Sequence, residues 1–176
     1  MVRLSRAFFV LSLFAASLST PNVVTEAHND ITQKIRPQIN TLKNDVSGFP
    51  ASGLTAIHSD VQTLVSTVIA ATEDIDIENA GSYGFGGGIV LLADIQGIMP
   101  TLFATFVNLG VQKNAFAAVS GGQALILSDL QSLNTSFSNY LDTLKGVSPF
   151  RLKLAWSGTT ALITGGFTTA IAEYSS

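Results

Sequence analysis

The chain has 176 residues, enough for one domain with a substantial core, and 47% of them are hydrophobic. Charged residues make up only 12%, about half the average of roughly 25% for soluble domains. The formal net charge is −3 and no basic stretch is available to follow a phosphate backbone, which excludes nucleic acid as the main partner. Cysteine is absent, so no disulfide stabilises the fold.

Residues 1–19 are predicted to be a signal peptide. Arg3 and Arg6 precede a short apolar run over residues 7–16, which is followed by small residues that suit a signal peptidase. This run is shorter than the roughly 20 residues that span a bilayer. We therefore expect export and a mature chain that begins between Leu18 and Pro21. Loss of the two arginines changes the net charge from −3 to −5.

Residues 20–176 are predicted to form a single all-α domain, an antiparallel bundle of about five amphipathic helices. Apolar residues recur at helical rather than alternating spacing, and no stretch has a convincing strand pattern. The predicted helices cover residues 30–46, 54–75, 88–119, 125–144 and 149–174. Ile89 and Leu162 are among the apolar residues that this periodicity places on inner faces.

Prolines and glycines predict several local features. Pro37 is expected to kink the first helix without ending it, and Pro100 to bend the long third helix. Ser148 and Pro149 are predicted to be the cap and first residue of the fifth helix. The segment Gly84–Gly88 has neither the Gly-Lys-Ser/Thr ending of a phosphate-binding loop nor a preceding strand, so we expect a flexible loop.

No residue pattern indicates an enzyme or a cofactor. His28 and His58 are the two histidines, and consecutive helical residues such as His58, Ser59 and Asp60 point to different faces, so they do not form a catalytic triad. The acidic stretch over residues 73–78 lacks the ligand spacing of an EF-hand and is expected to be a solvated helix end rather than a metal site.

Asn134 begins the sequon Asn-Thr-Ser, which predicts N-glycosylation in an exported protein. The same residue falls in the middle of a predicted helix, whereas acceptor asparagines are usually found in surface loops. Glycosylation at this position therefore has one argument for it and one against it.

Apolar residues on the inner faces of the second to fifth helices are the candidate lipid-binding residues. The abundance of aromatic rings, with glycines on the fifth helix, is compatible with either a filled core or an apolar cavity between helices. The candidates are Val68, Leu92, Ile95, Phe103, Phe106, Phe137, Leu141, Phe167 and Ile171.

The order and spacing of several short motifs resemble those of the fungal hydrophobic surface-binding protein A family, also called the cell wall galactomannoprotein family. The similarity covers about residues 30–174. The matching segments are Asp30-Ile31, Phe49-Pro50, Ala56-Ile57-His58-Ser59, Met99-Pro100-Thr101-Leu102, Lys113-Asn114-Ala115-Phe116, Ser128-Asp129-Leu130-Gln131-Ser132-Leu133 and Ala170-Ile171-Ala172.

This resemblance implies an exported, non-enzymatic, all-α protein that adsorbs to hydrophobic surfaces or holds a fatty-acid-like lipid in an apolar tunnel. Cell-wall polysaccharide or a recruited secreted hydrolase are further partners to consider, and the alternative function is a structural wall mannoprotein without a specific small ligand. The glycine-rich segment 83–88 replaces the polar start expected for the third helix, which predicts a different tunnel mouth. The sequence ends at Ser176 without a Ser/Thr-rich stalk or hydrophobic tail, so no GPI anchor is expected.

Overall fold

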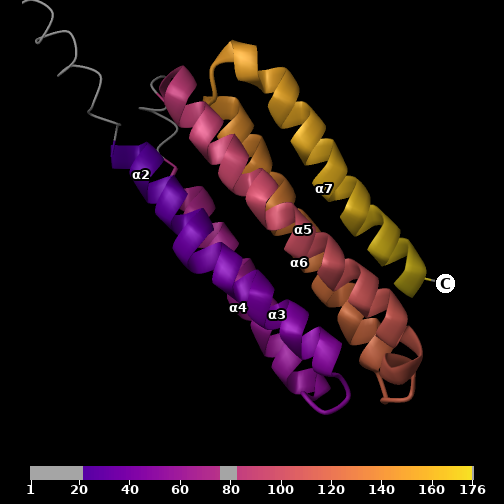
Figure 1. The fold of residues 1–176 in the computed structure, drawn as a ribbon. Helices are drawn as coiled ribbons and strands as arrows, with labels where there is room; N and C mark the ends of the chain where they lie inside the picture. The colour runs from indigo at the N-terminus through magenta and orange to yellow at the C-terminus, as the bar shows by residue number, and fades with distance from the viewer. Residues whose placement is uncertain (1–21, 76–82, 176) are drawn as a thin grey trace, which may run out of the picture.

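The computed structural model describes residues 22–75 and 83–175, and within these ranges the regular elements are all helical (Figure 1). The first predicted helix is a continuous succession of α2 (Asn22–Asn29), the π-helical η1 (Asp30–Ile35) and α3 (Arg36–Gly48). The elements that follow are α4 (Leu54–Glu73), α5 (Gly84–Ala117), α6 (Gly122–Val147), the 3₁₀ helix η3 (Phe150–Leu152) and α7 (Lys153–Tyr174). The prediction of an all-α bundle of five helices is confirmed. The predicted signal peptide lies outside the described residues.

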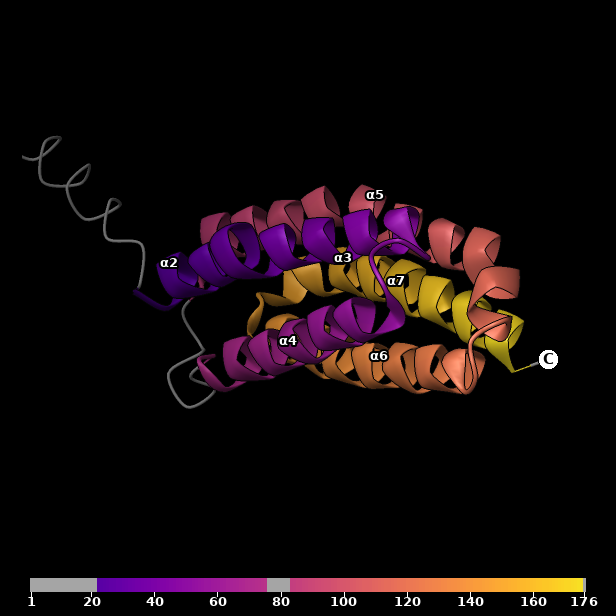
Figure 2. The same ribbon diagram turned by 90° about the horizontal axis from the view of Figure 1, so that it is seen from below.

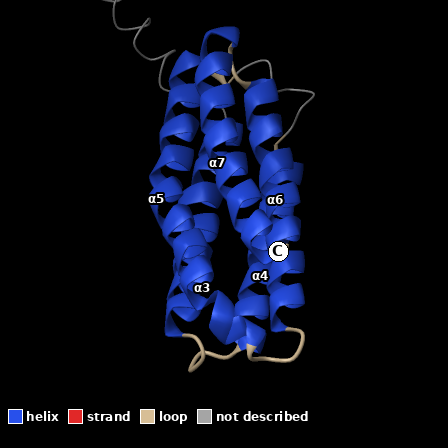
Figure 3. Cartoon of the chain, turned by 90° about the vertical axis from the view of Figure 1, so that its right-hand side faces the viewer, coloured by secondary structure: helices blue, strands red, loops and turns tan. Residues whose placement is uncertain are grey.

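Consecutive helices run antiparallel and close into a ring around one apolar core. In this ring α3 packs against α4 and α5, α7 packs against α5 and α6, and α6 packs against α4. Figure 2 shows α2, α3 and α5 in one layer and α4 and α6 in the opposite layer, while Figure 3 shows α7 passing between α5 and α6. We call the end with the connections 49–53 and 118–121 the turn end. The opposite end, where α5 starts and η3 lies, is the glycine end.

The first helix continues through Pro37, as predicted, and its π-helical segment ends two residues before the proline. Proline has no N–H to donate four residues back. At the preceding residue, the Arg36 N–H donates to the Ile31 carbonyl five residues back, which makes a wider, π-helical turn. A regular α-helix has 3.6 residues per turn, so side chains spaced four residues apart shift gradually around its circumference. The wider turn reduces this shift and keeps such side chains on one face. Ile31, Ile35 and Ile39 are all completely buried on the same face.

The segment Gly84–Gly88 is the first part of α5, so the prediction of a flexible loop was wrong. Close packing explains two of its glycines, Gly87 and Gly88. A Cβ atom on Gly87 would lie 2.8 Å from a methyl group of Val24, and one on Gly88 would lie 2.6 Å from a methyl group of Leu152. The absence of side chains therefore lets α2 and η3 approach the α5 backbone.

Two further local predictions concern prolines. Pro100 lies inside α5, which continues through it as a single helix of 34 residues that Figure 2 shows arched rather than straight. The prediction that Ser148 caps the fifth helix was wrong, because Pro149 leads into η3 and α7 begins only at Lys153. The Ser148 hydroxyl donates back to the Leu144 carbonyl at 2.7 Å, so it completes the end of α6 instead.

Aromatic rings tie three segments together at the turn end. Phe49 stacks on Phe116 with ring centroids 4.2 Å apart, and Phe116 lies 6.4 Å from the ring of Tyr174. The Tyr174 hydroxyl donates a hydrogen bond of 2.7 Å to the Leu109 carbonyl. These contacts join the α3–α4 connection, α5 and α7.

Two apolar residues that the periodicity placed on inner faces are exposed. Ile89 is 44% exposed on α5 and Leu162 is 61% exposed on α7. Both helices are apolar around much of their circumference, so the spacing of apolar residues does not define a single face. Trp156, Ile163 and Phe167 of α7 occupy the core instead.

Candidate functional site

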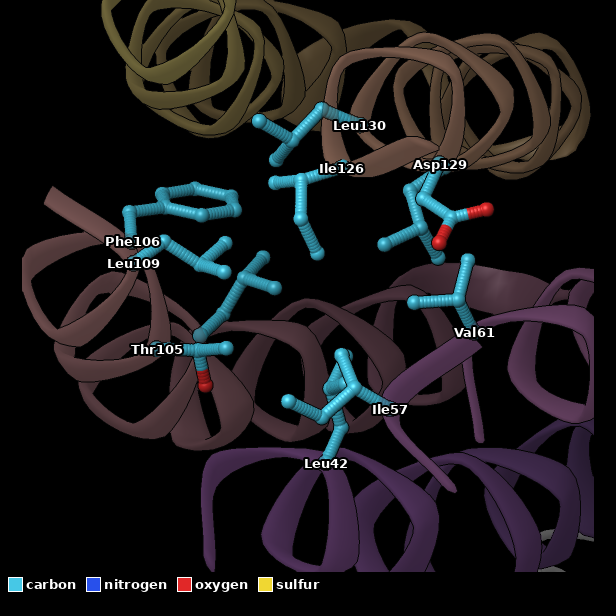
Figure 4. A pocket seen from close by; sticks show the side chains of 11 residues that line it. Leu42, Ile57, Val61, Thr105, Phe106, Leu109, Ile126, Asp129 and Leu130 are labelled. Carbon is cyan, nitrogen blue, oxygen red and sulfur yellow. The ribbon is translucent and has the colours of Figure 1, made fainter. Parts of the chain in front are cut away.

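An apolar cavity lies between α3, α4, α5 and α6. Its empty volume is about 330 Å³, but the centre of a water-sized sphere fits into only about 10 Å³ of it, which is room for about one water molecule. Figure 4 shows the lining side chains reaching into this space from the surrounding helices. The core is therefore nearly closed, and a lipid chain could occupy it only if side chains or helices moved apart. The lining residues are Leu42, Ile57, Val61, Leu102, Thr105, Phe106, Leu109, Ile126, Asp129, Leu130 and Leu133.

A row of phenylalanines extends from this cavity toward α7. Phe106, which lines the cavity, has its ring centroid 4.7 Å from that of Phe167, and Phe167 is 5.8 Å from Phe137. Phe103 lies 6.1 Å from Phe106 on the outer side of the row. Gly166 lets both α5 rings lie against the α7 backbone, because a Cβ at this position would come within 2.8 Å of Phe103.

The nine predicted lipid-binding residues have different positions in the structure. Val68, Leu92, Ile95, Phe106, Phe137, Leu141 and Phe167 are buried, whereas Phe103 and Ile171 are partly buried against the core. Phe106 is the predicted residue that also lines the cavity. Leu42, Ile57 and Val61 line the cavity and lie within predicted helices, but they are not among the nine predicted contacts. The predicted site does not include the first helix, although Leu42 of that helix lines the cavity, and it includes α7, which contributes no lining residue.

Asp129 supplies the charge at the cavity wall. Its carboxylate is paired with His58 of α4, whose Nδ1 lies 2.9 and 3.1 Å from the two carboxylate oxygens. Burial raises the pKa of Asp129, and the hydrogen bond and charge of His58 oppose this effect. His58 therefore joins α4 to α6 and is not paired with its sequence neighbours Ser59 and Asp60.

Two more ion pairs lie near the glycine end. The Asp30 carboxylate is 2.6 Å from the Lys34 ammonium, and the Asp94 carboxylate is 2.7 Å from Nδ1 of His28. In both pairs the acid is the more buried partner, with side chains 4% exposed for Asp30 and 58% for Lys34. The negative ends of these pairs therefore face the interior and the positive ends face the solvent.

The outer surface also has apolar residues, and most of them lie on two neighbouring helices. Ten large hydrophobic side chains are exposed among the described residues, and eight of these lie on α5, η3 and α7. No charged residue occurs between Asp94 and Lys113 or between Lys153 and Glu173. By length and composition α5 could cross a membrane, yet in the fold it packs in the bundle with 33% of its most apolar window buried. The eight residues, which we call the outer apolar face, are Phe85, Ile89, Val90, Val107, Val111, Phe150, Leu154 and Leu162.

Asn134 lies in the middle of α6, as predicted, and is half-buried. Its side-chain oxygen is buried and has no hydrogen-bond partner in the described part of the chain. Glycosylation at Asn134 stays a prediction. No group of three or more His, Cys, Asp or Glu side chains suited to a metal ion occurs within residues 22–75 and 83–175.

No protein sequence with a curated description matches the chain. The profile of the family described as Hydrophobic surface binding protein A matches residues 24–146, from the beginning of the described bundle almost to the end of α6. The chain belongs to the hydrophobic surface binding protein A family. The resemblance inferred from the short motifs is thereby confirmed.

Solved structures with the same fold come from proteins of low sequence identity to this family member. The structure of Afmp4p in complex with palmitic acid has a TM-score of 0.76 and 22% identity, covering 86% of this chain and 99% of that chain. Ligand binding domain 2 of the Penicillium marneffei MP1 protein, complexed with multiple arachidonic acids, has a TM-score of 0.76 and 13% identity, covering 84% and 94%. Ligand binding domain 1 of MP1, complexed with arachidonic acids, has a TM-score of 0.68 and 13% identity, covering 87% and 94%.

Proposed function

We propose that this protein is a secreted, non-enzymatic binder of long-chain fatty acids, and that it also adsorbs to hydrophobic surfaces. The observation that carries the first part is the apolar cavity with the adjoining row of phenylalanines. Each methylene group transferred from water into such a space contributes about 0.8 kcal/mol. A chain of roughly sixteen carbons can therefore offset the cost of immobilising the ligand and ordering the side chains around it.

The family and the related structures support this ligand class. Afmp4p and the MP1 domains have the same bundle fold, and their structures contain palmitic or arachidonic acid. We propose the nine candidate residues, from Val68 to Ile171, as contacts of the acyl chain, together with the residues that line the cavity. Uptake requires the helices to separate, because the interior between them has almost no free volume.

A titration tests the fatty-acid part of the proposal. The protein is freed of lipid by organic extraction, and a fluorescent fatty acid is added until binding saturates. We expect one saturable site from which palmitic acid displaces the probe. A flat titration with correctly folded protein would contradict the proposal and leave a structural cell-wall component as the favoured function.

The outer apolar face supports adsorption. Monomeric soluble proteins rarely expose large contiguous apolar areas, and such areas often mark contacts with other molecules or membranes. Val107 and Val111 are 65% and 74% exposed, four residues apart on the same helix face, and Leu162 of the neighbouring α7 is 61% exposed. A surface with so few charges can approach an apolar phase without removing water from many ions.

A combined variant separates adsorption from lipid uptake. Val107→Ser, Val111→Ser and Leu162→Ser together should reduce retention on a hydrophobic resin and leave the fatty-acid titration unchanged. Three matched substitutions of exposed polar residues elsewhere, Thr41→Ser, Thr55→Ser and Thr63→Ser, provide the control. Equal retention of wild type and the combined variant would show that another surface is responsible for adsorption.

Export and association with a fungal cell wall complete the proposal. The predicted signal peptide and the family membership support export. N-terminal sequencing of the secreted product should find a first residue between Leu18 and Pro21. A secreted product that still begins at Met1 would refute this cleavage.

A further inference from the structure

The corner between α6 and α7 carries the two most exposed large hydrophobic side chains of the described residues. Phe150 of η3 is 86% exposed and Leu154 at the start of α7 is 85% exposed. Leu152 and Trp156, which alternate with them along the chain, are buried and anchor the corner in the core. The backbone is therefore held on the bundle, while Phe150 and Leu154 extend into the solvent.

The start of α5 adds a third apolar side chain to this corner. Leu152 lies so close to α5 that a Cβ atom on Gly88 would come within 2.6 Å of its methyl group. Phe85 precedes Gly88 by three residues, which places it on the same face of α5, and it is 54% exposed. Figure 1 shows the orange connection between α6 and α7 at the glycine end, near the start of α5.

The corner is also locally positive, although the net charge of the chain is −3. Between Thr143 and Ala172 the charged residues are Lys145, Arg151 and Lys153, and no acid occurs in this stretch of the sequence. Arg151 and Lys153 are exposed, as are the apolar residues on either side of them. The basic corner, as we call this surface, consists of Phe85, Lys145, Phe150, Arg151, Lys153 and Leu154.

The acids that the structure describes at the glycine end lie on elements other than η3 and α7. Two of them, Asp30 and Asp94, are mostly buried and already paired with cations. Arg151 and Lys153 take part in none of the ion pairs found within residues 22–75 and 83–175. Their charges are therefore available to a partner. The exposed acids at this end are Glu26 on α2, Glu73 and Asp74 at the end of α4, and Asp142 on α6.

Exposed aromatic or aliphatic side chains next to Lys and Arg are typical of segments that lie on the surface of an anionic membrane. The apolar side chains enter the boundary of the acyl layer, while the cations stay at the level of the phosphates. An acidic polymer would attract the cations but would leave Phe150 and Leu154 in water. The combination therefore favours a bilayer over an acidic protein or polysaccharide.

We propose that the basic corner docks on a bilayer of anionic lipids. This inference rests on the proposed adsorption through the outer apolar face, to which Phe85, Phe150 and Leu154 belong, and it gives that surface a specific target. Docking in this orientation directs the glycine end of the bundle toward the lipid. A fatty acid then reaches the bundle from the bilayer without crossing the bulk water.

Vesicle flotation tests the charge component. Wild-type protein should bind vesicles of phosphatidylcholine and phosphatidylglycerol roughly tenfold or more tightly than vesicles of phosphatidylcholine alone. Arg151→Gln with Lys153→Gln should abolish most of this difference, because each cation near an anionic surface contributes to binding. Lys43→Gln with Lys113→Gln is the control of equal net charge, since both residues lie toward the turn end. An equal loss in the two double variants would overturn the proposal, because net charge alone would then explain the binding.

A second pair of variants tests the apolar component. Phe150→Ser with Leu154→Ser should weaken binding to the anionic vesicles about tenfold or more. The melting temperature should stay unchanged, because both side chains are exposed. Val107→Ser with Val111→Ser, farther along α5 on the outer apolar face, should reduce retention on a hydrophobic resin and leave vesicle binding unchanged. Vesicle binding that depends on Val107 and Val111 instead would refute the assignment to the corner.

Dextran sulfate serves as an anionic polymer without an acyl layer. It should bind the wild-type protein more weakly than the anionic vesicles do, and equal or tighter binding would overturn the choice of a bilayer. The fatty-acid titration and the resin assay are carried out on the same wild-type sample. Absence of vesicle binding in a sample that passes both assays would refute the docking alone. Failure in all three assays would instead refute the proposed function itself.

Discussion

Replacing Phe106 by Asp tests the packing of the core directly. Phe106 is 8% exposed, lines the cavity and has its ring 4.7 Å from that of Phe167. Removing a buried phenylalanine side chain costs about 3–5 kcal/mol, and an unpaired carboxylate in the same place adds a desolvation penalty. We therefore expect a loss of at least about 4 kcal/mol, a large part of the roughly 5–15 kcal/mol that stabilises a typical domain.

The neighbouring position supplies the control for this experiment. Val107 is 65% exposed on the same helix, so Val107→Asp should change the free energy of unfolding by no more than about 0.5 kcal/mol. Urea unfolding followed by circular dichroism would measure both variants. The melting temperature of Phe106→Asp should fall by roughly 10 °C or more. Equal stability of the two variants would refute the assignment of Phe106 to the interior.

Two further predictions concern α7 and the turn end. Gly166→Ala should be less stable than Gly165→Ala by about 1–3 kcal/mol in urea unfolding, because a Cβ on Gly166 would lie 2.8 Å from Phe103, whereas Gly165 has open space around it. Equal stability would contradict this close packing. Burial raises the pKa of Asp60 to about 6, and the hydrogen bond with Asp45 and the negative charge of Asp45 add to this effect. The folded state therefore retains a proton that the unfolded state loses near pH 4, so stability should fall as the pH rises from about 4 to 6. Asp60→Asn should flatten this dependence and raise stability at pH 7 by about 1 kcal/mol after screening by solvent. An unchanged pH profile would show that the two carboxylates do not interact.

The spacing of apolar residues was sufficient to predict the five helices, because a bundle helix needs one continuous buried face. Ile31, Ile35 and Ile39 illustrate this for the first helix, where even a proline did not interrupt the pattern. The start of that helix at Asn22 was missed, because Asn29 and Asp30 are a typical start signal and hid the continuation through α2. The segment 84–88 was misassigned as a loop because Gly87 and Gly88 serve close packing against Val24 and Leu152, which belong to distant segments.

The candidate site was harder to predict for the same reason. Periodicity shows that Leu42 and Phe106 point inward, but not which inward side chains meet around a cavity. The pairing of His58 with Asp129 joins residues 71 positions apart and has no local signal in the sequence.

The unequal ends of the bundle have a mechanical consequence. At the turn end, the stacked rings of Phe49 and Phe116 and the hydrogen bond of Tyr174 connect three segments. At the opposite end α5 starts with the glycine-rich segment 84–88, and each glycine weakens a helix by about 1 kcal/mol relative to alanine. The helices should therefore separate first at the glycine end, while the aromatic cluster keeps them together at the turn end. Amide protons of residues 109–116 should then exchange with solvent more slowly than those of residues 86–93.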